Sequence, residues 1–437
     1  MSSASMTSWG RYPAFPQRGL PVYWRDDVPD MLGRFSGSTT LAYGCGRSYG
    51  DSCMAASGQV LVMNPMNRLL SANWSTGLIE AEAGLTLSEL IQIALPHGWF
   101  PSVVPGTKFV TLGGAVANDV HGKNHHVSGT FGCHVRGLTM YRSTEGYVSA
   151  SRTERPELFS ATVGGLGLTG IIITVILQLR PVASGEIDQC STRFRNLDEF
   201  FELSATRDRA HEFTVAWIDC LATGKRSGRG IYIVGDHAKA GALAAAADKA
   251  LTFPIDPKIS LVNSFSLPLL NAVYYRRQLR SSVRGRVRYS SFFFPLDGVS
   301  KWNRIYGNAG FQQYQCVIPQ SNSREVIRAV LGEIARSGTG SFIAVLKQCG
   351  TMKSPGLLSF PLYGVSLALD FPQRAEVNDM LFRRLDQLVH EAGGRLYPAK
   401  DAHMTAQNFQ AAYPDWQLVE ALRDPRLLSR FWQRVTQ

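Results

Sequence analysis

Three observations in the sequence predict an α+β fold in two domains. The chain has 437 residues, which at about 150 residues per domain allows two or three domains, and we expect two. Short apolar runs and helical patterns alternate before Pro181, and the pattern changes after it. Hydrophobic residues make up 45% and charged residues 18%, a globular composition that excludes disorder throughout. We place the domain boundary near residues 182–190.

Residues 40–182 mix strands and helices and are rich in glycine. Short apolar runs in this part are typical of buried strands, whereas apolar residues at helical spacing predict helices. Pro96 and Gly98 end the longer helix. The expected elements are strands at 59–63 and 171–177 and helices at 85–95 and 157–161.

The part of the chain after Pro181 follows another pattern. Residues 251–270 are apolar without a clear period. Gly393 and Gly394 end an amphipathic pattern that predicts a helix. The expected elements are an exposed helix at 241–250, strands at 341–346 and 365–371, and a helix at 378–390.

Charge and cysteine usage limit the possible partners and compartments. The net charge of +11 favours anionic partners, such as a phosphorylated substrate, a cofactor diphosphate, nucleic acid or a membrane surface. The seven cysteines are scattered and form no CxxC, so we expect neither a disulfide framework nor a zinc ribbon, but a reducing compartment. The first residues lack the pattern of a signal peptide, and the longest aliphatic stretch is far shorter than the roughly 20 residues that span a bilayer. We therefore expect a cytoplasmic protein or one at the surface of the inner membrane.

The first motif is Gly44-Cys-Gly-Arg-Ser-Tyr-Gly-Asp51. Its three glycines let the backbone adopt positive φ and present consecutive N–H groups to an anion. Arg47 adds a positive charge and Ser48 a hydroxyl. The motif predicts either an anion-binding loop or an ordinary tight turn.

The second motif is a polar, glycine-punctuated tract over residues 105–132. Loops longer than roughly 12 to 15 residues are uncommon unless they serve a function. Adjacent His125 and His126 cannot share a helix face, and no Glu stands at HExxH spacing, so we predict no metal site. Histidines with structural hydrogen bonds are the alternative, and His121 is the one that we associate with chemistry.

A third motif, residues 164–170, contains GxGxxG. A dinucleotide fingerprint needs a strand before it and a helix after it. Here a predicted helix precedes the glycines and the β-branched run that starts at Ile171 follows them. We therefore reject a Rossmann NAD site, although glycines would still let the backbone lie against a flat ring.

Isolated polar residues in apolar strands form a fourth pattern. Gln313 and Gln315 precede an apolar pair, and Lys347 follows the run that ends at Leu346. A lysine at the end of a buried strand is costly to desolvate unless it meets an anion or takes part in chemistry. Lys400 stands in a similar setting. The alternative is that each lysine extends to solvent.

An arginine cluster follows the apolar segment 251–270. It lacks a nucleic-acid-binding motif and a ladder of aromatic residues, so we predict no nucleic-acid partner. An apolar segment followed by arginines suits a phosphorylated lipid or an anionic membrane surface, and a solvated basic surface is the alternative. Its members are Arg276, Arg277, Arg280, Arg284, Arg286 and Arg288.

Taken together, the motifs resemble the decaprenylphosphoryl-β-D-ribose 2′-oxidase family, which belongs to the vanillyl-alcohol-oxidase type of FAD-linked oxidoreductases. The resemblance runs from about Trp9 to the C-terminus. It is carried by GRSYGD, PGT, TLGGAVANDVHGKNHH, GTFGCHVR, ELFSATVGGLGLTG, WNRIYGNAGFQQYQCVIP and GGRLYPAKD. The HGKNHH tract is its most specific part.

The resemblance implies a two-domain, PCMH-type FAD-binding fold. An FAD domain would comprise residues 1–183, a substrate domain on a mostly antiparallel sheet residues 184–394, and residues 395–437 would return to the FAD domain.

The resemblance also implies a site. Lys400, Tyr49 and His121 would be the catalytic residues, with Lys400 as base or as cation beside the developing alkoxide. Gln315, Lys347 and Phe293 would line the substrate pocket, with Lys347 towards the substrate phosphate. The FAD site would comprise Gly44, Cys45, Gly46, Arg47, Ser48, Tyr49, Gly50 and Asp51 around the diphosphate, and Gly106, Thr111, Leu112, Gly113, Gly114, His121, Gly122, Lys123, Asn124, Ile171 and Tyr397.

Some positions depart from the mycobacterial members of the family. Ser366 and Ala368 replace an asparagine and a cysteine, Cys349 replaces an aromatic residue, and Phe293 replaces a tyrosine. We expect these changes to alter the pocket wall without touching the flavin chemistry.

The implied activity is oxidation of the 2′-hydroxyl of a polyprenylphosphoryl-β-D-ribose to the 2′-keto sugar. This is the first half of an epimerisation to an arabinose donor for cell-envelope polysaccharide, and a separate short-chain reductase partner would complete it. Peripheral membrane contact would follow from the lipid tail. The alternatives are an FAD-dependent aldonolactone or polyol oxidase that acts on a soluble sugar, and a non-catalytic binder of phospholipid or nucleic acid.

Overall fold

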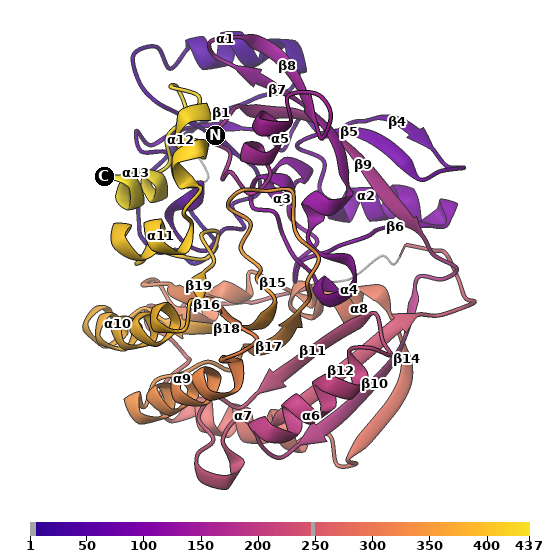
Figure 1. Cartoon of the computed structure of the whole chain (residues 1–437), viewed down its shortest axis with the longest axis vertical. Helices are drawn as coiled ribbons and strands as arrows, with labels where there is room; N and C mark the ends of the chain where they lie inside the picture. The colour runs from indigo at the N-terminus through magenta and orange to yellow at the C-terminus, as the bar shows by residue number, and fades with distance from the viewer. Residues whose placement is uncertain (1–5, 246–249) are drawn as a thin grey trace.

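The computed structural model describes residues 6–245 and 250–437. It has an α+β fold, as predicted, with helices beside sheets that are mostly antiparallel. Figure 1 shows the N-terminal half of the chain, together with the yellow C-terminal helices, above a large sheet formed by the middle of the chain.

Two sheets form the N-terminal half. A small parallel sheet has the order β1 (Arg18–Pro21), β3 (Gln59–Val62), β2 (Leu41–Tyr43). The second sheet is antiparallel and has the order β4 (Leu69–Asn73), β5 (Leu78–Glu82), β9 (Ile171–Pro181), β7 (Val135–Arg142), β8 (Gly146–Ser151), with β6 (Trp99–Pro101) also paired to β9. The strands predicted at 59–63 and 171–177 are confirmed as β3 and β9.

The helices of this half are short, and three of the five contact the six-stranded sheet. In α2 (Leu87–Ala94), the Thr86 side chain accepts a hydrogen bond from the backbone of Glu89, and the Glu89 carboxylate binds the backbone of Thr86. The chain leaves this helix through Gly98 at φ 80°, which only glycine adopts readily, so the predicted helix and its end are confirmed. The other helices are α1 (Val28–Gly33), α3 (Leu112–Ala117), α4 (His125–Ser128) and α5 (Pro156–Thr162).

An antiparallel sheet of eight strands dominates the second half. Its order is β14 (Ser282–Arg288), β10 (Glu186–Phe194), β12 (Gly230–His237), β11 (Phe213–Ile218), β17 (Ala344–Cys349), β18 (Gly364–Pro372), β16 (Phe311–Pro319), β19 (Arg395–Leu396). Helices α6 (Leu197–Arg207), α9 (Ser323–Ser337) and α10 (Ala375–Glu391) cover one face of it (Figure 1). The helix predicted at 378–390 is confirmed as α10.

The two faces of this sheet differ because successive side chains of a strand point to opposite sides. Tyr314 and Leu369 face the covering helices and belong to the largest apolar cluster of the described chain. Gln313, Gln315 and Asp370 point to the other face, towards the N-terminal half. The sheet therefore presents a polar face to the rest of the molecule.

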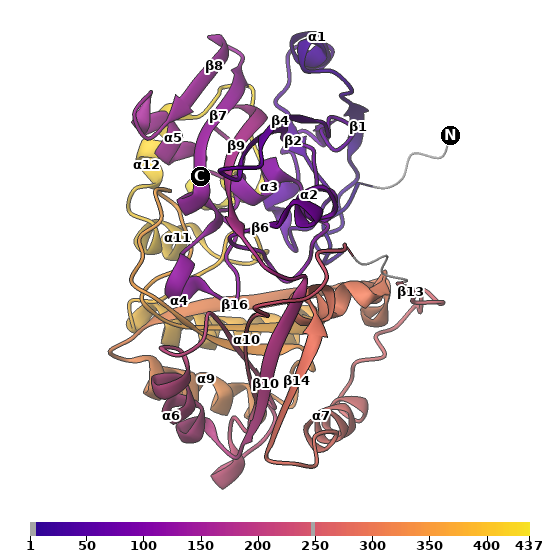
Figure 2. The ribbon, with the colours of Figure 1, turned by 90° about the vertical axis from the view of Figure 1, so that its right-hand side faces the viewer.

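The remaining elements of the second half lie at its edges. They are β13 (Leu251–Thr252) paired with β15 (Val299–Ser300), α7 (Ser266–Arg276) and α8 (Tyr289–Phe293). Figure 2 shows α7 on the far side of β10 and β14 from α6 and α9.

The C-terminal segment returns to the N-terminal half. After β19 it forms α11 (Ala406–Ala412), α12 (Trp416–Leu422) and α13 (Arg430–Thr436). Leu427 and Ser429 form isolated bridges with Thr40 and Ala55. The chain leaves the six-stranded sheet at Pro181 and enters the eight-stranded one at Glu186. The domain boundaries at 183/184 and 394/395 stay predictions.

Two predicted elements differ from the structure. Residues 241–245 have no regular secondary structure, because Ala242 accepts a hydrogen bond from the backbone of Gly185; residues 246–249 of that predicted helix lie outside the described chain. The strand predicted at 341–346 begins only at Ala344, since the Ser341 hydroxyl binds both backbone groups of Ile343 in a local turn. The strand predicted at 365–371 is confirmed as β18.

Candidate active site

The candidate site lies between the polar face of the eight-stranded sheet and three segments of the N-terminal half and the C-terminal tail. Those segments are the glycine loop 44–51, the tract 118–125 and the turn 397–401. The structure thus brings together Tyr49, His121, Gln315, Lys347, Tyr397 and Lys400, all predicted from the sequence.

The loop 44–51 is held by the C-terminal tail. The backbone N–H of Tyr49 donates to the carbonyl of Ala399 at 3.0 Å. A Cβ added to Gly50 would overlap the carbonyl oxygen of Asp401, so this position needs glycine. Arg434 clamps the arrangement from outside, with ion pairs of 2.8 Å to Asp51 and 2.9 Å to Asp401.

The same loop has the features of a diphosphate site. Gly46 adopts φ 59°, which favours glycine. The Arg47 Nε and the Ser52 Oγ are buried and have no hydrogen-bond partner among the described residues. Burial also lowers the pKa of Arg47 from its ordinary value. A buried guanidinium and hydroxyl without acceptors fit an anionic ligand, because its oxygens would satisfy both groups.

A second glycine segment lies against this loop. Gly44 has no room for a side chain, since its Cβ would stand 2.6 Å from the Thr111 hydroxyl oxygen. That hydroxyl accepts the Gly114 N–H at 3.1 Å and begins α3. The two glycine segments predicted to hold the cofactor are therefore neighbours in space.

His121 is fixed from both sides of its ring. Lys347 Nζ donates to its Nδ1 at 2.6 Å and to the carbonyl of Gly122 at 2.8 Å. Burial, with the charge of Lys347, holds the pKa of His121 well below its ordinary value, so the ring is neutral. Since Nδ1 accepts, Nε2 carries the proton. The nitrogen of the Gln315 side-chain amide lies 3.0 Å from this Nε2, so the amide must be assigned in its flipped orientation, with the oxygen as acceptor.

Tyr397 is buried in the site beside His121. Its hydroxyl donates to the carbonyl of Asn118 at 2.7 Å, and its ring stacks on Phe360 with centroids 4.7 Å apart. The His121 ring centroid lies 5.6 Å from that of Tyr397. This buried tyrosine is therefore held in place through both its hydroxyl and its ring face.

Lys400 lies over the ring of Tyr49, with its Nζ 3.4 Å from the ring centroid. Burial lowers the pKa of Lys400 towards neutrality, the carboxylate of Asp370 raises it, and Arg47 lowers it. Burial raises the pKa of Tyr49 well above its ordinary value, so its phenol keeps its proton. Burial also raises the pKa of Asp370 to about 7, so Lys400 and Asp370 are the two groups here that can exchange a proton near neutral pH.

Asp370 belongs to this site and was missed by the sequence analysis. It is fully buried; its Oδ1 accepts a 2.5 Å hydrogen bond from Gln313, and its Oδ2 has no partner among the described residues. Burial raises its pKa, while Gln313 and Lys400 act in the opposite direction. A signal was present, because this is the one charged residue inside the apolar run Val365–Phe371.

Other predicted residues contact the protein itself. Lys123 Nζ donates to the carbonyls of Phe292 and Phe293 at 2.9 and 3.0 Å, and burial lowers its pKa to about 7. Phe293 is 1% exposed and packs edge-on against Phe213. Its side chain therefore lies in an apolar core rather than among the polar groups of the site.

The last members of the predicted cofactor set support the loop structure. Asn124 donates to the carbonyl of Ser102 at 2.8 Å. Ile171, at the start of β9, is 1% exposed in the cluster under β3. Gly106 is exposed, with open space where a Cβ would stand. In residues 6–245 and 250–437, no three His, Cys, Asp or Glu side chains are grouped as metal ligands would be.

A glycine-lined anion loop facing a sheet with a buried lysine and carboxylate fits a flavin-dependent oxidoreductase. In agreement, residues 34–151 match the family model described as an FAD binding domain. The chain is 36% identical over 405 residues to the decaprenylphosphoryl-β-D-ribose oxidase of Mycolicibacterium smegmatis, with 89% of this chain and 87% of the relative covered. It belongs to the family of that oxidase, and FAD is its cofactor.

Further relatives are consistent with this assignment. An uncharacterised protein of Streptomyces coelicolor is 35% identical over 78% of this chain and 96% of its own length. The L-gulonolactone oxidase of Bos taurus is 29% identical, but over only 40% of each chain. The predicted family, cofactor and enzyme class are confirmed.

Proposed function

We propose that this enzyme oxidises the 2′-hydroxyl of a polyprenylphosphoryl-β-D-ribose to the 2′-keto sugar. The observation that carries the proposal is the position of the buried Lys400 amine, which lies over the Tyr49 ring and within the electrostatic influence of the buried Asp370 carboxylate. The relative with 36% identity is named for a decaprenylphosphoryl ribose, which supports this class of substrate.

FAD, when bound, supplies the acceptor for the hydride that leaves the sugar carbon. We assign its diphosphate to the loop 44–51, with Arg47 and Ser52 as donors, and the rest of the cofactor to the glycines of 111–114 and the tract 121–124. Tyr397 and Ile171 would close the site.

The side chains of the site remove the proton of the sugar hydroxyl and orient the sugar. As a neutral amine, Lys400 accepts that proton, and the resulting ammonium lies in the field of the Asp370 carboxylate. Tyr49 keeps its proton and supports the amine through its ring face. Neutral His121, with its proton on Nε2, and Gln315 orient the sugar by hydrogen bonding.

We assign Lys347 to positioning rather than to the substrate phosphate. Its ammonium already donates to His121 and to Gly122, and only 7% of the residue is exposed. The substrate phosphate is then left to basic groups outside this sheet face.

The direct test follows the visible absorbance of the flavin. Without oxygen, a short-chain polyprenylphosphoryl ribose is expected to bleach the wild-type protein, and Lys400→Ala should slow this by about 100-fold or more while FAD stays bound. Exposed Lys225→Ala is the control. Bleaching by L-gulonolactone and not by the lipid-linked sugar would favour the aldonolactone oxidase instead.

The partners follow from the product. A 2′-keto sugar on a lipid must be reduced with inverted stereochemistry to give an arabinose donor, so we propose a separate short-chain reductase as partner. The lipid tail places the substrate in a bilayer, so we propose a peripheral location at the inner membrane. Within the described ranges, no helix combines the length and apolarity needed to cross a bilayer.

A further inference from the structure

The buried side of helix α7 combines polar and apolar contacts. Asn271 is 1% exposed and donates to the Asp219 carboxylate at 2.9 Å, and Leu267 is buried in an apolar cluster. Gln278, just after the helix, binds the backbone and hydroxyl of Ser191. The helix is therefore anchored to the sheet without the use of its outward side.

The outward side of α7 and its flanks is apolar. Phe265, Leu269 and Val273 follow one another at helical spacing and are 89%, 66% and 59% exposed, and Leu279 is 86% exposed. Scattered exposed apolar residues are normal, but a row of them on one helix face marks an interaction site. We call these four residues the α7 face.

The chain on and around α7 is strongly basic. Residues 257–296 contain seven Lys and Arg and no Asp or Glu. Arg276, Arg277 and Arg280 are exposed on α7 and just after it. The arginines of β14 lie on the other face of the sheet, because Arg284 pairs with Cys190, which belongs to the apolar cluster on the α6 side. Within the described chain, Arg286 is the one member of the arginine cluster with an ion pair, to Asp188 and Glu186. Apolar side chains rimmed by cations complement a bilayer with anionic headgroups.

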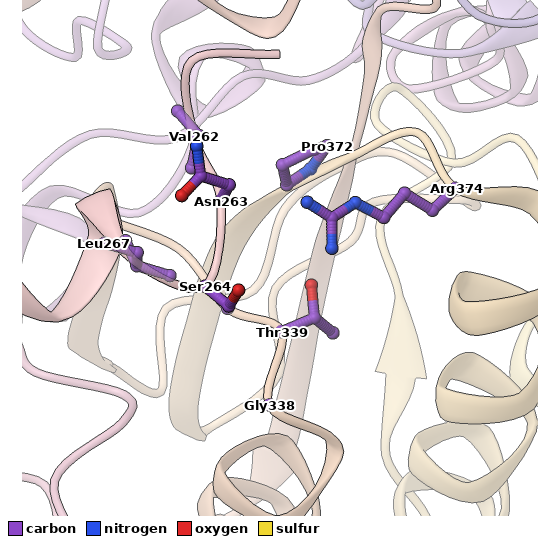
Figure 3. A pocket seen from close by; sticks show the side chains of 9 residues that line it. Val262, Asn263, Ser264, Leu267, Gly338, Thr339, Pro372 and Arg374 are labelled. Atoms are coloured by element: carbon purple, nitrogen blue, oxygen red, sulfur yellow. The ribbon is translucent and has the colours of Figure 1, made fainter. Parts of the chain in front are cut away.

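The base of α7 connects inward to the candidate site. Figure 3 shows Val262 and Leu267 beside a small cavity near Thr339 and Pro372. Val262 and Leu267 also belong to an apolar cluster with Tyr306 and Phe311, and Tyr49 packs against it. Phe311 lies edge-on to Tyr49 with centroids 5.3 Å apart. Apolar contacts therefore connect the buried side of α7 with the Tyr49 ring.

We propose that the α7 face, together with Arg276, Arg277 and Arg280, forms the surface by which this protein docks on an anionic lipid bilayer. Phe265, Leu269, Val273 and Leu279 enter the boundary between headgroups and acyl chains, and the arginines contact the headgroups. Such a surface would suit an enzyme with a lipid-linked substrate. The apolar side chains of α7 and the arginines beside them suggest docking whatever the substrate is.

The test is sedimentation of the FAD-loaded protein with vesicles. Equimolar phosphatidylcholine and phosphatidylglycerol vesicles should bind the wild type, and pure phosphatidylcholine should bind it much less. The double substitution Leu269→Asp with Val273→Asp should weaken binding by about tenfold or more. Arg276→Glu with Arg280→Glu should weaken it similarly, because each cation near such a surface contributes to binding.

Matched controls are available on other helices. Met380→Asp and Leu418→Asp alter apolar side chains that are 64% and 54% exposed, and Arg383→Glu alters an exposed arginine. All three should bind vesicles as the wild type does, and flavin absorbance and thermal unfolding confirm that every variant folds.

Two outcomes would overturn the inference. One is equal vesicle binding by the α7 variants and the wild type. The other is a change in oligomeric state without a change in vesicle binding, which would assign the face to a second copy of the chain. Bleaching of the α7 variants by detergent-dispersed substrate tests the catalytic proposal separately, because detergent removes the need for docking.

Discussion

Lys347 Nζ lies 2.6 Å from His121 Nδ1, and this hydrogen bond joins the central strand β17 to the histidine-containing tract. Because Lys347 also donates to the Gly122 carbonyl, it fixes the ring orientation and the backbone beside it. One buried ammonium therefore decides which nitrogen of His121 carries the proton facing Gln315.

Lys347→Met should keep the volume of the side chain and remove both hydrogen bonds. A misplaced His121 should lower the rate of flavin reduction by about 100-fold, since small errors in orientation cost this much. The loss should fall on the rate constant rather than on the substrate dissociation constant, as single-turnover kinetics can distinguish. A phosphate-binding lysine would give the reverse, weaker substrate binding at an unchanged limiting rate.

The sequence identified the residues of this site that stand in local motifs. The loop 44–51, the tract around His121 and the turn at Lys400 carry their glycine and polar patterns within a few residues. The sequence did not predict which residues Lys347 contacts, because His121 is 226 residues away along the chain. That pairing depends on how the sheet packs on the N-terminal half, which no local pattern encodes.

Asp370 and Arg434 illustrate the same limit. The strand pattern of 365–371 was recognised, but only the register with Gln313 shows which face the carboxylate occupies. Arg434, near the C-terminus, reaches Asp51 in the glycine loop, 383 residues away. The helix predicted to start at residue 241 is absent over residues 241–245 for a related reason, because a tertiary hydrogen bond to Gly185 outweighs local propensity there.

Arg434→Met should loosen the contact between the glycine loop and the tail. The side chains of Asp51 and Asp401 are 6% and 1% exposed, and loss of a partner from such a buried pair costs about 3 to 5 kcal/mol. We expect a lower midpoint of thermal unfolding and weaker FAD retention. Exposed Arg383→Met serves as the control, and an unchanged midpoint in both variants would contradict the clamp.

The decrease in the free energy of unfolding at acid pH should reflect the ion pair between Arg434 and Asp401. Burial raises the pKa of Asp401, but His403 and Arg434 bring it below its ordinary value. A carboxylate with a lowered pKa stabilises the fold above the unfolded-state pKa and loses that effect as the pH falls through the folded value. The wild type should therefore lose stability below about pH 4, in the range of the unfolded carboxyl. Asp401→Asn should show a shallower acid limb in denaturant unfolding, and an identical limb would refute this role.

Gly50 and Gly106 form a matched pair for the glycine argument. An alanine at Gly50 would overlap the Asp401 carbonyl, whereas at Gly106 its Cβ would meet open space. Gly50→Ala should therefore lower the unfolding midpoint of the protein even without added FAD. Gly106→Ala should leave that midpoint unchanged, and reduced FAD affinity in fluorescence titration would show that the cofactor approaches its backbone. Equal destabilisation by both substitutions would contradict the packing at Gly50.

The substitution Asp370→Asn tests Lys400 as the proton acceptor, because it should change the pH dependence of flavin reduction. Flavin reduction needs Lys400 as a neutral amine, so its rate should rise with pH through the pKa of Lys400. The Asp370 carboxylate raises that pKa against the effect of burial, and an amide removes this contribution. The ascending limb of the rate profile should therefore move to lower pH in Asp370→Asn, although loss of the anion that stabilises the ammonium should lower the plateau. Single-turnover bleaching across the pH range measures both quantities, with Asp379→Asn, an exposed position on helix α10, as a matched control that leaves Asp370 in place. If the ascending limb does not move, or moves to higher pH, Asp370 does not raise the pKa of Lys400.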